Sequence, residues 1–332
     1  MRFIVLGAGS IGQRHLKNLL EMGHQAAAVF DPDPNKLEAL RRLASCGVVT
    51  DDEARAFGCE ADAAIVCSPN SFHIPQARQA LQRGLHVFIE KPLSHSLEGT
   101  DALAADAAKA KRIVLVGCNL RFCPSLLLVK RLLDEGRIGR PLAARAHCGY
   151  YLPYWRPGLD YRDGYGASQA AGGGILLDSI HEFDYLRWLL GEVVEIFCYA
   201  GKASTLEIDT EDNADVLLRL ASGLSVNLHL DYLQRTYRRS CEFIGEEGLI
   251  AWDYIAEKVT LYEKEDRLCK VFQRNINSEL NAMYVGEMSH FVRCIEGAEK
   301  PVLDAVEASA VLKIVLAAKT SASEGRAVKI KI

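Results

Sequence analysis

The stretch Gly7-Ala8-Gly9-Ser10-Ile11-Gly12 decides the fold of this chain, because it follows the apolar run Phe3–Leu6 and opens the helical pattern Ile11–Met22. A strand, a glycine turn and a helix in this order are typical of the first βαβ unit of a doubly wound parallel sheet. The glycines permit a tight turn, a close approach of the backbone to a pyrophosphate, and close packing of helix on strand. The helix N-terminus offers unpaired N–H groups to phosphates. The motif predicts a dinucleotide site formed by Gly7, Gly9, Ser10, Ile11 and Gly12; the alternative is a glycine-rich turn in another βαβ unit.

Asp31 extends this prediction to the choice of cofactor. It lies 19 residues after Gly12, at the end of the second apolar run. A carboxylate at this position accepts hydrogen bonds from the ribose hydroxyls and repels a 2′-phosphate. The following residues, Pro32-Asp33-Pro34, supply no arginine for such a phosphate. The sequence therefore favours NAD over NADP, and the alternative role of Asp31 is that of a helix N-cap.

The first 120 residues alternate short apolar runs with helical segments. The expected strands are Phe3–Leu6, Ala26–Phe30, Ala63–Cys67, His86–Ile89 and Ile113–Val116. The expected helices are Ile11–Met22, Asn35–Ala44, Ile74–Arg83 and Leu97–Ala110. Alternation of this kind predicts an α/β domain with a Rossmann-type, doubly wound parallel sheet, covering residues 1–121.

The second half of the chain has a different order of secondary-structure elements. The expected strands follow one another with short polar turns: Leu142–Tyr150, Val193–Ala203, Ala214–Ala221, Leu224–Tyr232, Ser240–Ile244, Leu249–Tyr254 and Lys258–Glu263. Two helices, Ala282–Glu296 and Ala305–Ser323, are expected to close the chain. Residues 122–332 are therefore predicted to form an α+β domain with one large, mostly antiparallel open sheet. Such a sheet needs a cover on each face, so we expect it to pair with another subunit.

Two further motifs stand at the ends of neighbouring strands. Cys67-Ser68-Pro69-Asn70 and Glu90-Lys91-Pro92 each follow a buried run. Ligands of open α/β sheets bind outside the carboxyl ends of the strands, so both motifs are expected to face the cofactor. Lys91 is set apart from an ordinary solvated lysine, which is the alternative, by its position between Glu90 and a proline.

Composition excludes several classes of function. The chain has 332 residues, 39 Lys and Arg against 43 Asp and Glu, and a net charge of −4, which does not suit nucleic-acid binding. No apolar run approaches the length of a membrane span, and the N-terminus leaves no room for a signal peptide. The ten cysteines form no CxxC pair, so we expect a reduced, cytoplasmic protein. Scattered histidines predict no metal site, and no GxSxG motif supports hydrolysis by a serine nucleophile.

Taken together, these motifs resemble the Gfo/Idh/MocA family of NAD(P)-dependent oxidoreductases over essentially the whole chain. The similar segments are the glycine turn with His15, Ser68-Pro69-Asn70 with His73, Glu90-Lys91-Pro92, Asn119-Leu120-Arg121-Phe122, and Gly172-Gly173-Gly174 followed by Asp178, His181 and Asp184. The resemblance implies a C-terminal sheet used for oligomerisation, as a homodimer or homotetramer. It adds Ser68, Asn70, His73, Glu90 and Lys91 to the cofactor site.

The resemblance also implies an activity and its catalytic residues. The activity is reversible oxidation of a secondary hydroxyl of a sugar, cyclitol or nucleotide-linked sugar, with hydride transfer to the nicotinamide. Lys91 matches a lysine beside the reacting hydroxyl, where its charge would stabilise the alkoxide. His181 matches the acid/base histidine, and Asp178 an acidic residue that precedes it. The spacing of Asp178 to His181 is three residues, whereas the usual family spacing is four.

The segment Leu176–Leu190 has apolar residues at helical spacing, which independently favours one helix. On that helix Asp178, His181, Glu182 and Tyr185 would share a stripe. An imidazole flanked by carboxylates is oriented to accept a hydroxyl proton as a general base. The alternative is a solvated helix face with incidental charges.

A segment rich in aromatic residues and arginine, Tyr150–Arg162, precedes the triple glycine. Aromatic faces suit a sugar ring, and the guanidinium fork suits a carboxylate or phosphate. This segment predicts an anionic or nucleotide-linked sugar bound by Trp155, Arg156, Tyr161 and Arg162, and the end of the first domain adds Asn119 and Arg121. The resemblance adds Asp178 and His181 to the substrate site. The alternatives are a packed loop and, for Arg121, a structural ion pair.

Two other functions use the same motifs. An NAD-dependent glycoside hydrolase would oxidise a sugar hydroxyl, eliminate the aglycone and reduce the sugar again. A non-catalytic NAD-binding sensor would need the glycine turn but not Lys91, His181 and Asp178 together.

Overall fold

The computed structural model describes residues 1–38, 40–42, 46–264, 269–273 and 281–331. It divides into two compact units. Unit 1 consists of Met1–Asn119 and Asn281–Leu312, and unit 2 of Leu120–Leu280 and Lys313–Ile332. The predicted domain ranges, 1–121 and 122–332, differ from these units in two places: Leu120 and Arg121 belong to unit 2, and Asn281–Leu312 packs within unit 1.

Unit 1 contains a six-stranded parallel sheet in the order β3-β2-β1-β4-β5-β6. The strands are β1 (Arg2–Leu6), β2 (Gln25–Phe30), β3 (Cys46–Thr50), β4 (Ala63–Val66), β5 (His86–Glu90) and β6 (Val114–Gly117). The helices are α1 (Ser10–Glu21), α2 (Pro34–Glu38), α3 (Glu53–Phe57), α4 (His73–Gln82), α5 (Thr100–Ala110) and α9 (Ala282–Ile295). This order confirms the doubly wound fold. The strand order reverses between β1 and β4, and ligands bind at such a point.

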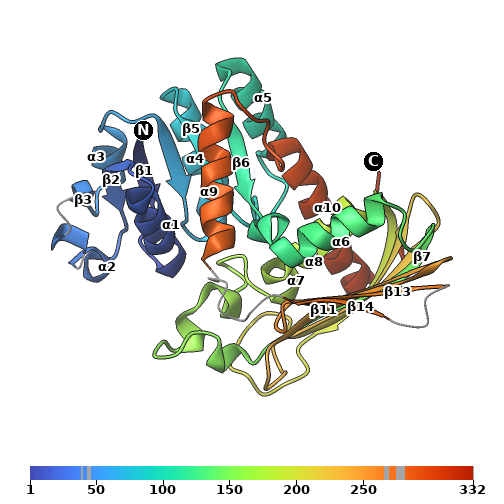
Figure 1. Ribbon diagram of the computed structural model, residues 1–332. Coiled ribbons are helices and arrows are strands. Elements are labelled where there is room, and N and C mark those ends of the chain that lie inside the picture. The colour runs from blue at the N-terminus through green and yellow to red at the C-terminus, as the bar shows by residue number, and fades with distance from the viewer. Residues whose placement is uncertain (39, 43–45, 265–268, 274–280, 332) are drawn as a thin grey trace. The chain divides into compact units, whose positions relative to one another are not determined.

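The core of unit 1 explains why a distant segment belongs to it. Phe88 of β5 and Phe291 of α9 meet edge to face, with ring centroids 5.8 Å apart. Met288 and Phe291 are fully buried in the same cluster as Phe3 and Val5 of β1. Figure 1 shows α9 in orange beside the blue α1, with which it is in contact. The helix therefore covers part of the sheet formed by the first half of the chain.

Unit 2 contains a nine-stranded sheet in the order β14-β13-β12-β11-β7-β10-β9-β8-β15. The strands are β7 (Pro141–Gly149), β8 (Val193–Gly201), β9 (Asn213–Leu220), β10 (Ser225–Asp231), β11 (Arg238–Gly245), β12 (Gly248–Asp253), β13 (Lys258–Glu263), β14 (Lys270–Gln273) and β15 (Val328–Lys329). All neighbouring pairs are antiparallel except β7 and β10. The sheet is thus mixed but mostly antiparallel, as expected.

Helices cover one face of this sheet. Those of unit 2 are α6 (Pro124–Asp134), α7 (Ile175–Asp178) and α8 (Ile180–Leu190); α10 (Ala305–Glu324) begins in unit 1 and continues into unit 2. Figure 1 shows α6 and α8 over the same face, where α6 contacts β12 and β13 and α8 contacts β7. On β9, β10 and β11 buried residues alternate with residues of the other face, which these helices do not cover.

Several sequence predictions change in detail. The predicted helix Asn35–Ala44 is α2 followed by the 3-10 turn Leu40–Arg42, while residues 39, 43 and 44 lie outside the described residues. The predicted helix Leu176–Leu190 is divided at Ser179 into α7 and α8. Among the described residues, no helix combines the length and apolar character that a bilayer-spanning segment requires. All ten cysteines are free.

Candidate active site

The glycine turn joins β1 to α1 in unit 1. Gly7 has φ +96°, and a Cβ there would lie 2.6 Å from the backbone of Cys67 at the end of β4. A Cβ on Gly12 would lie 1.9 Å from the Gly7 carbonyl oxygen, so α1 packs directly on the turn. Gly9, the N-cap of α1, has open space around its Cβ position and no side-chain cap. An open backbone and an uncapped helix N-terminus fit a pyrophosphate.

Asp31 follows β2 and is buried, with 3% of its surface exposed. Its carboxylate accepts a hydrogen bond from the Ala8 amide at 2.8 Å and one from the Asp33 amide at 3.0 Å. The first of these bonds ties the carboxylate to the glycine turn. The Lys36 ammonium lies 3.4 Å from the same carboxylate, a neighbour that the sequence prediction did not include. It brings a cation to the place where a 2′-phosphate would meet Asp31.

The loops after β4 and β5 are joined through His73, the first residue of α4. Its Nε2 lies 2.8 Å from the Ser68 carbonyl oxygen, and its Nδ1 lies 2.8 Å from the Pro92 carbonyl oxygen. Burial lowers the pKa of this imidazole. The Ser68 hydroxyl donates to the Gln76 amide oxygen at 2.7 Å, and Asn70 is buried in the short turn Asn70–Phe72. His73 therefore holds two predicted cofactor loops together through their backbones.

Lys91 directly follows β5, and its peptide bond to Pro92 is cis. The Glu90 carboxylate accepts a hydrogen bond from the Lys91 amide at 3.1 Å and contacts His15 Nε2 at 2.6 Å. Glu287 of α9 lies in the same cluster and is 1% exposed. Burial, and after it the nearby Glu90, raises the pKa of Glu287 well above its usual value. Glu90 thus fixes the backbone of Lys91 and connects it to α1.

In unit 2, Asp178 is surrounded by tyrosines. Its carboxylate accepts hydrogen bonds from the hydroxyls of Tyr150, Tyr165 and Tyr232. Burial, with the nearby Asp178 charge as the next cause, raises the pKa values of Tyr150 and Tyr232, which keeps both hydroxyls protonated. Three donors from separate segments of unit 2 therefore hold this carboxylate in place.

The residues after Ser179 do not form the predicted shared stripe with Asp178, because Ser179 leaves helical geometry with ψ 29°. His181 lies in the first turn of α8 and is 8% exposed. Glu182 is fully buried and forms an ion pair at 2.7 Å with Arg239 of β11, whose side chain is 12% exposed. Tyr185 is also fully buried and packs edge to face on Trp252, with ring centroids 5.4 Å apart. Of the predicted stripe, only Asp178 is separated, because α7 ends there; His181, Glu182 and Tyr185 remain together on α8 and are buried.

Arg121 forms the buried ion pair that the sequence left open as an alternative. Its guanidinium donates two hydrogen bonds to Asp184 of α8, at 2.9 Å and 2.7 Å. Both side chains are buried, with 7% and 1% exposed. A bidentate pair of this kind is geometrically specific. Its neighbour in sequence, Asn119, is also buried, at the start of the 3-10 turn Asn119–Phe122.

The predicted substrate segment separates into a packed part and an exposed part. Trp155 stacks on Tyr150 at 4.1 Å between ring centroids while 43% of its surface stays exposed. The Arg156 guanidinium lies 5.8 Å from the centroid of the Tyr165 ring. Both aromatic partners hydrogen-bond to Asp178, so these two residues lie over the tyrosine cluster. The exposed Arg162 pairs with Asp160 and Glu207, and the Tyr161 hydroxyl accepts from the Glu207 amide.

Sequence reasoning missed Tyr165, Tyr232, Arg239, Glu287 and Lys36. Four of these five residues come from segments far along the chain from their partners, and no local spacing connects them. Lys36 could have been found, because it follows Asp31 by five residues on a short helix.

A Rossmann sheet with an open glycine turn is typical of a dinucleotide-binding protein, here joined to a second unit built on a broad mixed sheet. Residues 1–118 match the model described as the oxidoreductase family with an NAD-binding Rossmann fold. Residues 126–251 match the model of the GFO/IDH/MocA C-terminal domain. The chain belongs to the Gfo/Idh/MocA family of oxidoreductases, as the resemblance predicted.

Relatives and solved structures agree with this assignment. The myo-inositol 2-dehydrogenase of Thermotoga maritima is 29% identical over 100% of this chain and 99% of its own. The inositol 2-dehydrogenase 4 of Saccharopolyspora erythraea is 31% identical over 75% of this chain and 72% of its own. The solved structure of a levoglucosan dehydrogenase, in complex with NADH and levoglucosan, has a TM-score of 0.91 and 18% identity, with 100% of both chains covered. At that identity the last similarity concerns the fold.

Proposed function

We propose that this enzyme is an NAD-dependent dehydrogenase that oxidises a secondary hydroxyl of a cyclitol or a related sugar, nucleotide-linked sugars included. The similarity to a myo-inositol 2-dehydrogenase along the whole chain carries this proposal. The open glycine turn and the loops joined by His73 support the binding of a dinucleotide. Bound NAD would supply the hydride acceptor.

Residues of the chain would take the hydroxyl proton and stabilise the negative charge that develops on the substrate oxygen. His181 takes the hydroxyl proton as a general base. Lys91 places a positive charge beside the oxygen that becomes an alkoxide. Asp178, held by Tyr150, Tyr165 and Tyr232, is the third residue of this proposal. Because its carboxylate is already oriented, it would bind or orient a substrate hydroxyl without further ordering.

For substrate recognition we propose the residues that the sequence selected. Trp155 and Arg156 are supported by their positions over the tyrosines that hold Asp178. Arg162 and Tyr161 are exposed or partly exposed and would contact the outer part of a larger substrate. Asn119 and Arg121 are buried, and the ion pair of Arg121 with Asp184 favours a role in positioning for this arginine.

The proposed activity can be tested by incubating the purified chain with NAD and a panel of inositols, free sugars and nucleotide sugars while following NADH. We expect net NADH formation with one of these compound classes. A glycoside of the same sugar distinguishes the dehydrogenase from an NAD-dependent glycoside hydrolase. The hydrolase would release the aglycone without net NADH formation. If the chain binds NAD but turns over neither class, the sensor function applies and the dehydrogenase proposal fails.

We also propose NAD as the preferred cofactor, and Asp31→Asn tests it. The substitution removes the charge but keeps an oxygen that can accept from the Ala8 amide. The ratio of kcat/KM for NAD to that for NADP is expected to fall about 10- to 100-fold, since a like-charge contact at 4 Å costs about 1–4 kcal/mol. The matched control is Asp33→Asn, two residues away, which is expected to leave the ratio unchanged. An unchanged ratio in Asp31→Asn would contradict the role given to this carboxylate.

A homodimer or homotetramer through the nine-stranded sheet is a further part of this proposal. Tyr199, Leu217 and Tyr262, on strands of that sheet, expose 69%, 51% and 47% of their surfaces. A second copy of this chain would cover such apolar area, and light scattering in solution measures whether it does. A cytoplasmic location, supported by ten free cysteines, is likewise proposed and can be checked by cell fractionation.

A further inference from the structure

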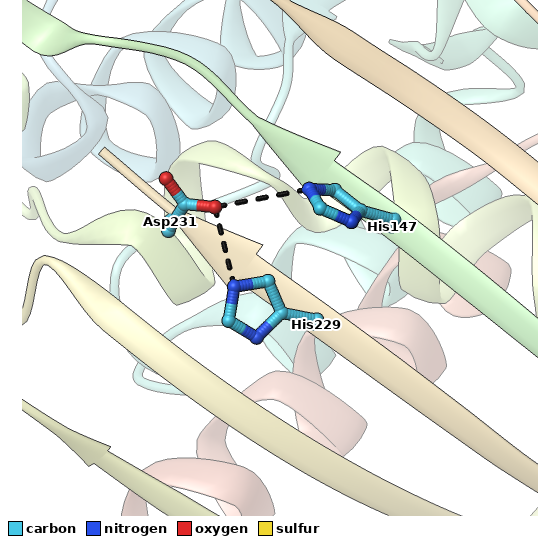
Figure 2. Close-up of side chains that lie close together, drawn as sticks. All are labelled: His147, His229 and Asp231. Atoms are coloured by element: carbon cyan, nitrogen blue, oxygen red, sulfur yellow. Dashed lines mark ion pairs between the residues drawn. The ribbon is translucent and has the colours of Figure 1, made fainter. Parts of the chain in front are cut away.

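Three side chains gather on the face of the nine-stranded sheet that α6 and α8 leave uncovered. His147 of β7 and His229 of β10 are register partners on two parallel neighbouring strands. Asp231 follows His229 by two residues, so it lies on the same face of β10. Figure 2 shows both imidazole rings and the Asp231 carboxylate converging. They adjoin a hollow of about 500 Å³ that is lined by both histidines.

The distances between the three groups are those of a ligand set. Asp231 Oδ2 lies 3.2 Å from His229 Nε2 and 3.8 Å from His147 Nε2. One atom from each residue lies within 4.8 Å of the other two. Two ligands of a tetrahedral metal with bonds of about 2.0 Å are about 3.3 Å apart. The two distances from Asp231 Oδ2 are close to this separation, and the two imidazole nitrogens are no more than 4.8 Å apart.

Each ligand is held by a second contact. Asp215 of β9, the register partner of His229, accepts from His229 Nδ1 at 2.7 Å. This bond directs Nε2 toward Asp231. Asp231 Oδ1 accepts from the amides of Leu233 and Gln234 at 2.8 Å and 2.7 Å, which leaves Oδ2 for the histidines. A carboxylate on the far nitrogen of a ligand histidine is the usual support of a metal site.

The surroundings also suit a cation. The Asp215 and Asp231 carboxylates lie 2.7 Å and 3.2 Å from the two ring nitrogens of His229, so two acidic groups face one imidazole. Gly149, the register partner of Asp231, keeps the site open, because a Cβ there would lie 2.3 Å from Asp231 Oδ2. The amide oxygen of Gln234 lies 2.7 Å from His147 Nε2. This oxygen is placed to supply a fourth ligand after a small shift.

We propose that His147, His229 and Asp231 bind a divalent transition metal ion of the zinc class, with Asp215 as the residue that orients His229. Two imidazoles and one carboxylate favour Zn²⁺ or Co²⁺ over Mg²⁺ and Ca²⁺, which prefer oxygen ligands. About one third of each histidine side chain is exposed in the single chain, so the ion can enter before a second copy covers this face. The bound ion links β7 to β10, the single parallel pair of the sheet.

The test uses the full chain, freed of metal with a chelator and then titrated with Co²⁺ and Zn²⁺. We expect one Co²⁺ per chain with the visible absorption of a tetrahedral site, displacement by Zn²⁺, and an increase in Tm with either ion. A parallel titration with Mg²⁺ is expected to show no binding at the same concentrations. The double variant His147→Gln/His229→Gln is expected to lose this binding.

Asp215→Asn distinguishes a built site from scattered surface histidines. It leaves all three ligands in place, and we expect the affinity for Zn²⁺ to fall about 10- to 100-fold. The control His86→Gln, in unit 1, is expected to leave the titration unchanged. Circular dichroism of each variant shows whether it is folded. If the wild-type chain binds no metal, or if the folded double variant binds it as tightly, the proposal is wrong.

Discussion

Lys91→Met is expected to lower kcat about 10²- to 10³-fold, with a much smaller change in the KM for NAD. Methionine keeps the length of the side chain but removes the charge that would stabilise the developing alkoxide, and loss of one such group has an effect of this size. Because the charge matters in the transition state, the decrease should fall on kcat more than on substrate binding. Steady-state kinetics with the substrate found in the screen measures both constants.

Two further variants serve as controls for Lys91→Met. Lys91→Arg keeps a positive charge and is expected to retain more activity than Lys91→Met. Lys109→Met removes an exposed lysine of α5 in the same unit and should leave kcat unchanged. A kcat of Lys91→Met within about threefold of the wild-type value would contradict the proposed role of Lys91 in stabilising the alkoxide.

His181→Gln is expected to lower kcat about 10²- to 10⁴-fold, the range attributed to a positioned general acid or base. Glutamine preserves hydrogen bonding but cannot take a proton. The limb of the pH–rate profile that reports the base should therefore disappear, and this change separates proton transfer from a structural role. The measurement is kcat/KM as a function of pH for both proteins.

The control for this variant is His24→Gln, a partly exposed histidine that follows α1. It should leave both the rate and the pH profile as they are. If His181→Gln loses activity but keeps the wild-type pH profile, another group is the base and His181 acts by packing. Unchanged NAD binding by His181→Gln would show that unit 1 is intact.

The architecture was largely predictable because its signals are local. The glycine turn, the buried apolar runs and the change to consecutive strands each occupy a short segment. The strands that were missed are β3, β14 and β15, and all three lie at sheet edges. β14 is exposed along its whole length and β15 has two residues, so neither carries the apolar pattern of a buried strand. The parallel pairing of β7 with β10 could not be predicted, because pairing partners are set by tertiary structure.

The candidate site was predictable only at single positions. Motifs selected Lys91 with Glu90, His181 and Asp178, but not Tyr165 and Tyr232, which hold Asp178. The partners of Asp178 come from the residue after β7, from a 3-10 turn and from the residue after β10, so their convergence depends on the folded sheet. The expectation from the sequence that no metal site exists has the same weakness. His147 and His229 are far apart in sequence, and only the register of two strands places them side by side.

The return of Asn281–Leu312 to the first sheet has a practical consequence for dissecting the enzyme. An excised fragment of residues 1–121 would keep every strand of that sheet but lose Met288 and Phe291, leaving an apolar flank bare around Phe3 and Phe88. Nucleotide binding therefore cannot be assigned by expressing the N-terminal portion in isolation. A polypeptide that reaches at least to Leu312 is the smallest N-terminal piece in which this flank would be sealed.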